Sequence, residues 1–86
     1  GATIVCSGKV DIDPTAAGAT ELGISLPVSS NFGALEDCAG TAVGLTIATI
    51  GAAILADTTS DRASLQFVAV DTGNKSFYYT FTYQVI

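Results

Sequence analysis

SFYYTFTYQVI, residues 76–86, carries the most regular pattern in the chain. Every second residue is aromatic or aliphatic, namely Phe77, Tyr79, Phe81, Tyr83 and Val85. The residues between them are Ser, Thr and Gln, together with one further aromatic residue, Tyr78. Because successive side chains of a β-strand point to opposite faces of its sheet, the pattern predicts a strand with one buried face and one polar face. Tyr78 is expected on the polar face, where it is a candidate contact at a subunit interface or ligand patch.

The same alternation marks two segments near the N-terminus. In residues 3–12 apolar residues and glycine hold the even positions, and residues 20–26 carry leucine or isoleucine at every second position. Pro14 and Gly18 lie between them and favour a tight connection, because proline fixes its own φ and glycine accepts a positive one. We therefore expect two strands that pair with each other.

The segment 39–56 contains no charged residue and has two interpretations. Its length approaches that of a membrane-spanning helix, and Gly40 and Gly44 form a GxxxG pattern. However, β-branched residues alternate with small ones, Gly51 is suited to a turn or bulge, and no Lys, Arg, Trp or Tyr anchor flanks the segment. The pattern favours two strands and no insertion into a membrane.

The rest of the chain completes a set of short strands. Residues 58–61 predict a hairpin that leads into a strand at 62–70, and residues 71–74 predict a second hairpin that leads into 76–86. About six to eight short strands at regular spacing predict an all-β fold, either an antiparallel β-sandwich or a jelly-roll-like barrel. A chain this short encloses one core, so residues 1–86 are expected to form a single domain.

The composition points to assembly and away from several functions. Hydrophobic residues make up 49% of the chain and charged residues 13%, so much of the surface is uncharged and suited to contact with identical copies. The net charge of −5 repels nucleic acid. Histidine is absent, and most acidic residues lie beside turns, where aspartate stabilises the loop. We expect no catalytic residue, no metal site, no cofactor and no enzymatic activity.

The two cysteines, Cys6 and Cys38, leave two alternatives open. A disulfide between them would close a loop of about thirty residues and add roughly 3–4 kcal/mol in an oxidising compartment. Two buried free thiols are the other interpretation. Cys6 is expected to point inward, because it shares a face with the apolar residues of its strand.

Four segments together resemble a C-terminal β-rich domain of bacteriophage tail-fibre and related virion structural proteins. They are SGKVDIDPT at 7–15, LGISLP at 22–27, DCAGTA at 37–42 and FYYTFTY at 77–83, and the likeness covers nearly the whole chain. The resemblance implies a non-enzymatic domain that ends a fibre in the virion, often as a homotrimer, and contacts a glycan or protein on the host surface. It also implies a further strand before the point that corresponds to Gly1.

Two other functions fit the sequence. A low-charge β domain with an unpaired strand edge could be an extracellular, pilus-like filament subunit that polymerises by strand exchange. The size and Tyr78 also fit a small monomeric carbohydrate-binding module, although such a module explains the shortage of charge less well. The oligomeric state distinguishes the three, since a fibre end closes its symmetry, a filament propagates and the module is a monomer.

Overall fold

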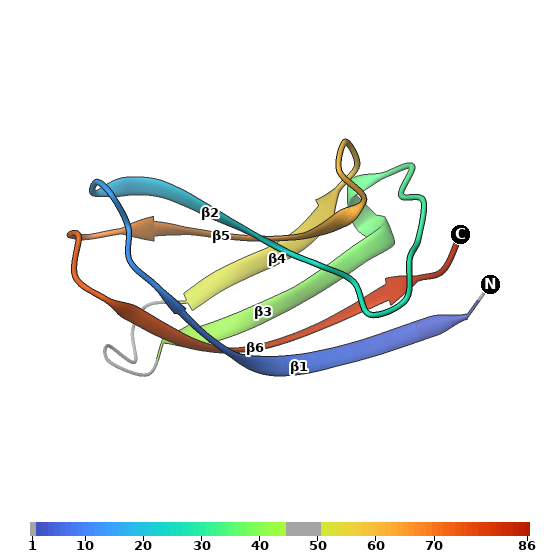
Figure 1. Ribbon diagram of the computed structural model, residues 1–86, viewed down its shortest axis with the longest axis horizontal. Helices are drawn as coiled ribbons and strands as arrows, with labels where there is room; N and C mark the ends of the chain where they lie inside the picture. Colours follow the sequence, from blue (N-terminus) through green and yellow to red (C-terminus); the bar gives the residue numbers. More distant parts are fainter. Residues whose placement is uncertain (1, 45–50) are drawn as a thin grey trace.

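A computed structural model describes residues 2–44 and 51–86 of the chain. Within these residues the fold is all-β and antiparallel, with six strands and one short 3₁₀ helix, η1 (Figure 1). The elements are β1 (Thr3–Ile12), β2 (Gly18–Ile24), η1 (Leu35–Asp37), β3 (Cys38–Gly44), β4 (Gly51–Asp57), β5 (Arg62–Ala69) and β6 (Lys75–Gln84).

The strands form one sheet in the order β1-β6-β3-β4-β5-β2, and the sheet curls into a half-barrel (Figure 1). Twist and curl bring the inner faces of distant strands toward each other, which encloses a core without a second sheet. Phe67 on β5 packs against Phe77 on β6 in this way, with ring centroids 4.8 Å apart. The largest fully buried side chains belong to this inner face and are Tyr83, Phe77, Phe81, Leu65 and Cys38.

The predicted all-β fold class is confirmed, and β1 has the predicted bounds. The alternation in 76–86 also predicted the faces of β6 correctly, since Phe77, Phe81 and Tyr83 are buried while Tyr78 is exposed. The prediction of two strands in 39–56 is confirmed for the described residues, because β3 and β4 are antiparallel neighbours and β4 begins at Gly51. Residues 45–50 lie outside the described part of the chain. No helix among the described residues is long and apolar enough to span a membrane.

Two predicted pairings are wrong. β1 pairs with β6 and β2 pairs with β5, so the two N-terminal strands lie at opposite edges of the sheet. Residues 71–74 do not close a hairpin either, because β5 and β6 belong to different parts of the sheet order. Local turn chemistry does not distinguish a hairpin from a connection that crosses between distant strands. The hairpin at 58–61 is confirmed by the pairing of β4 with β5.

The segment between β2 and η1 closes one end of the half-barrel through side-chain contacts with β6 and the residues after it. The Tyr83 hydroxyl donates to the carbonyl of Val28 at 2.7 Å and accepts from the N–H of Val28 at 3.1 Å. The Ser30 hydroxyl donates to the carbonyl of Gln84 at 2.6 Å and accepts from the N–H of Ile86 at 3.0 Å. These bonds hold an irregular segment on the core without regular secondary structure.

A candidate interaction surface

Tyr78 lies on the outer side of the sheet, near the start of β6. It is 54% exposed, and β6 places it between Lys9 on β1 and Val43 on β3, its two cross-strand partners. Val43 is also half exposed, at 50%. Cross-strand partners stand about 5 Å apart, so the ring of Tyr78 and the side chain of Val43 form one continuous apolar surface.

Uncharged side chains surround Tyr78 on the outer side of four neighbouring strands. In register, Ser7 lies opposite Thr80, which lies opposite Thr41, which lies opposite Ala53. We call the exposed, uncharged residues of β1, β6, β3 and β4 the outer patch; its members are Thr3, Val5, Ser7, Ala39, Thr41, Val43, Gly51, Ala53, Tyr78, Thr80, Thr82 and Gln84.

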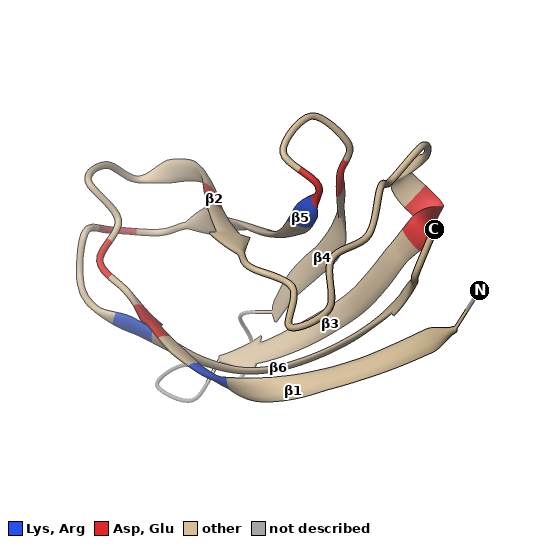
Figure 2. Ribbon diagram, turned by 45° about the vertical axis from the view of Figure 1, so that its right-hand side comes forward, with Lys and Arg blue, Asp and Glu red and all other residues tan. Residues whose placement is uncertain are grey.

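Charge is confined to the margins of this surface. Figure 2 shows β3 and most of β6 without a charged residue, whereas the coloured residues gather near strand ends and connections. Lys9 and Asp11 border the outer patch on β1, and Glu21 lies on the far edge strand, β2. A partner that covers the outer patch would therefore approach charge only at its border, at Lys9 beside Tyr78.

A shallow hollow of about 310 Å³ adjoins Tyr78. Its lining combines two tyrosines with the hydroxyls of two threonines and two small aliphatic residues from β3 and β6, namely Tyr78, Tyr79, Thr80, Thr41, Ala42 and Val43. Such a lining offers an aromatic surface and a few hydrogen-bonding groups.

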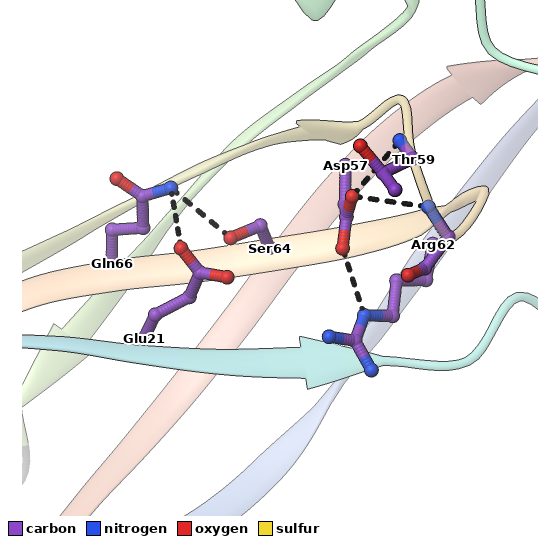
Figure 3. Close-up of polar contacts among 7 residues, drawn as sticks. Glu21, Asp57, Thr59, Arg62, Ser64 and Gln66 are labelled. Carbon is purple, nitrogen blue, oxygen red and sulfur yellow. Dashed lines mark hydrogen bonds and ion pairs between the residues drawn. The ribbon is translucent and has the colours of Figure 1, made fainter.

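Sequence analysis missed a second feature of the outer side, around Glu21 on β2. The side-chain amide of Gln66 donates to the Glu21 carboxylate at 3.2 Å and to the Ser64 hydroxyl at 3.1 Å (Figure 3). A hollow of about 540 Å³ adjoins Glu21 and Gln66. This contact could not be predicted from the sequence, because Glu21 and Gln66 become neighbours only when β2 pairs with β5.

The acidic residues beside turns have the structural role that the sequence predicts. Asp57 accepts bonds from the N–H groups of Thr59 and Ser60, each at 3.1 Å, and forms an ion pair with Arg62 at 3.0 Å (Figure 3). The pKa of Asp57 is lowered, chiefly by the Ser60 N–H and further by Arg62. Asp37 likewise accepts from the N–H groups of Gly33 and Ala34, four and three residues before it, at 2.9 Å each. Both carboxylates stabilise loops, and the lowered pKa of Asp57 means that its ionised form is the favoured one.

Lys75 is buried, and two acceptors compensate its charge. Its ammonium group lies 2.5 Å from the Asp71 carboxylate and 2.7 Å from the carbonyl of Gly73. The pKa of Asp71 is lowered, first by the bond from Lys75 and next by the N–H of Gly73. The turn between β5 and β6 is therefore organised by one buried cation.

Cys6 and Cys38 are free thiols in the structure. They lie on β1 and β3 with β6 between them, so their backbones are separated by about two strand spacings, or roughly 9–10 Å. A disulfide allows at most about 7 Å between Cα atoms. Burial, followed by the proximity of Cys6, raises the pKa of the Cys38 thiol to about 11, so it is protonated at neutral pH. Cys6 lies on the inner face as expected, where it is partly buried against the core.

The described residues, 2–44 and 51–86, contain no group of three or more potential metal ligands. Comparison of the chain with known protein families, with curated proteins and with solved structures gives no match. The resemblance to tail-fibre domains therefore depends on the four quoted segments alone. What the fold defines is a small all-β domain with a curled antiparallel sheet and an uncharged outer patch.

Proposed function

We propose that this chain is a non-enzymatic structural domain that assembles with identical copies of itself through the outer patch. The observation that carries the proposal is the position of the exposed Tyr78 beside the exposed Val43, where they continue the uncharged surface of β6 and β3. Aromatic residues at the centre of an interface, with charge kept to the rim, are typical of contact surfaces between subunits. Together with the resemblance of the sequence, this favours a closed homotrimer at the end of a virion fibre, in contact with a host surface.

Size supports association for an independent reason. A domain of 86 residues hides only about 60–65% of its unfolded surface, so contact with a neighbour adds burial that its own core lacks. The net charge of −5 opposes the approach of identical copies, but β3 and most of β6 carry no charge, and Lys9 and Asp11 only border the outer patch (Figure 2). At physiological salt their repulsion is screened beyond about 8 Å.

Binding of a carbohydrate is a second candidate, because of the hollow beside Tyr78. Aromatic rings stack on sugar faces, and the hydroxyls of Thr41 and Thr80 could donate to or accept from sugar hydroxyls. A host glycan bound at the same place would compete with assembly through the outer patch, so a domain that uses the hollow for a sugar would be a monomer.

The test is the mass of the particle in solution, measured by light scattering over a dilution series. We expect a closed species whose mass is a multiple of three chains of 8.7 kDa, and we expect Tyr78→Arg to abolish the trimer. Val68→Arg is the matched control, because Val68 is also an exposed apolar residue on the outer side of a strand but lies on β5, outside the outer patch.

Three outcomes would contradict the proposal. A wild-type monomer at every concentration would favour the carbohydrate-binding module, and a glycan array would then follow. Long filaments would favour the strand-exchanging subunit. Equal loss of assembly in Tyr78→Arg and Val68→Arg would show that copies associate through another surface.

A further inference from the structure

The two edges of the sheet are the strands β1 and β2, and each has a paired neighbour on one side. β1 pairs with β6 over ten residues, and no backbone hydrogen bond within residues 2–44 and 51–86 joins the other side of β1 to another element. Figures 1 and 2 both show the N-terminal part of β1 along the margin of the molecule, away from β2. About half of the backbone N–H and C=O groups of β1 therefore point outward without a protein partner.

β1 lacks the features that normally protect a sheet edge. Its register with β6 is continuous from Thr3 to Ile12, so no bulge bends the strand away, and it contains no proline. Its residues 3–8 carry no charge. The other edge strand, β2, is shorter and has Glu21 at its centre. Long, regular and uncharged edges are the ones to which a further strand adds.

The inner side of β1 is also incompletely covered. Phe77, Phe81 and Leu65 on interior strands are no more than 2% exposed, whereas Ile4 and Val10 on β1 are partly exposed although they pack against the same core. A strand added beside β1 would place its own inward side chains next to these residues and extend the buried surface.

We propose that β1 of a second copy adds to this edge, antiparallel to the first β1 and centred on Ser7, so that the sheet continues from one molecule into the next. In this register residues 3–11 of each strand pair, with Val5 opposite Lys9 and Thr3 opposite Asp11 of the other copy. The numbers of two facing residues always sum to twice seven, so even-numbered residues face even-numbered ones and apolar inward residues meet apolar inward residues.

The charges on β1 disfavour two of the other registers. A pairing centred on Lys9 would place two ammonium groups opposite each other, and one centred on Asp11 would do the same with two carboxylates; both are destabilising. A shift by one residue would turn the apolar side of one strand toward solvent. The contact differs from association through the outer patch, because it uses the backbone groups of the β1 edge, although Val5 and Ser7 also contribute side chains to the patch.

Disulfide trapping tests the pairing. Ser7→Cys places a thiol at the twofold centre, where the two Cα atoms would lie about 4.5–5.5 Å apart, within the range of a disulfide. Thr80→Cys is the matched control, because Thr80 is the exposed cross-strand partner of Ser7 but lies on β6, one strand in from the edge. Both variants carry Cys6→Ala, and the buried Cys38, with its raised pKa of about 11, stays unreactive.

Both proteins also carry Tyr78→Arg, which prevents association through the outer patch. Crosslinking then reports on the β1 edge alone, so the two proposals are tested separately. Under mild oxidation we expect Ser7→Cys to give a dimer on non-reducing gels at least tenfold faster than Thr80→Cys. A mixture of Val5→Cys and Lys9→Cys proteins should form the mixed dimer faster than either forms its own, because the register places these two positions opposite each other.

Equal and slow crosslinking of Ser7→Cys and Thr80→Cys would overturn the proposal that β1 is a pairing edge. Self-crosslinking of Val5→Cys or Lys9→Cys faster than their mixture would overturn the register centred on Ser7. Loss of the trimer in Tyr78→Arg has no bearing on either result, because the crosslinking is measured in that background.

Discussion

The two sides of β6 differ in environment although they alternate along one strand. On the inner side, Phe77, Phe81 and Tyr83 are 0%, 2% and 1% exposed. On the outer side, Tyr78 is 54% exposed and Thr80 and Thr82 are open to solvent. The same kind of side chain, a large aromatic ring, therefore lies in the core at one position and on the surface at the next.

Aromatic content alone does not explain this difference; the surroundings of the strand do. β6 is an interior strand between β1 and β3, and its inward rings meet each other and rings from other elements. Phe81 stacks on Tyr79 at 5.8 Å, and Tyr83 meets Phe32 edge to face at 6.0 Å. Tyr78 faces the outer patch and has no such cover in the single chain. The inward aromatic residues of β6 therefore stabilise the fold, while Tyr78 is available for contact with another molecule.

The largest effect is expected on the inner side. Phe81→Ala should lower the free energy of unfolding by about 3–5 kcal/mol, because it leaves a cavity beside Tyr79 and Tyr83 in a close-packed core. Urea unfolding followed by circular dichroism measures the change. Thr80→Ala, next to it on the outer side, is the control and should change stability by less than about 0.5 kcal/mol. Similar losses for both would mean that the two sides of β6 are assigned wrongly.

A smaller effect on stability is expected from the hydroxyl of Tyr83, on the inner side of β6. Tyr83→Phe keeps the ring but removes both hydrogen bonds to Val28, and should cost about 1–2 kcal/mol. Hydrogen exchange at the Val28 amide should increase in the same variant, because the segment after β2 loses its attachment. Tyr78→Phe removes the corresponding hydroxyl on the outer side and should leave stability unchanged. If Tyr83→Phe is as stable as wild type, the hydroxyl does not hold this segment.

A pH-dependent effect is expected at the start of β6, where Lys75 is buried against Asp71. The folded-state pKa of Asp71 lies below the ordinary aspartate value of 3.8, so its ionised form stabilises the native state above that pH. This contribution is lost as pH falls through the lower, folded-state pKa. Wild type should therefore have a higher urea midpoint than Asp71→Asn at pH 5–7, and the difference should shrink below about pH 4. A difference that stays constant down to pH 2 would contradict a role for the ionised carboxylate.

Strand positions and faces could be predicted from the sequence because they depend on short-range alternation. The period of two in 76–86 and in 3–12 is sufficient to assign which side of each strand is buried, and β6 and β1 follow it. Aspartate beside a turn, as at Asp57, is also a local signal, since its partners lie two and three residues away.

The pairing of strands could not be predicted in the same way, because it depends on contacts between residues far apart in the chain. The two N-terminal strands look like neighbours, yet the curl of the sheet separates them to opposite edges. The contact of Glu21 with Gln66, and the burial of Lys75, follow from that order. The position of Tyr78 on the outer side was predictable, but its adjacency to Val43 required the register of β6 with β3.

The smallest effect on stability is expected for Tyr78→Ala, which separates the role of the outer side of β6 from that of its inner side. Measured at a concentration at which the wild type is a monomer, the variant should unfold within about 0.5 kcal/mol of wild type, because the ring is half exposed and little burial is lost. At higher concentration its assembly should weaken at least tenfold, since a central aromatic contact of an interface contributes about 1.4 kcal/mol or more. A loss of folding stability as large as that of Phe81→Ala would instead place Tyr78 among the residues that hold the sheet together. It would contradict the proposed role of Tyr78 in contact between copies.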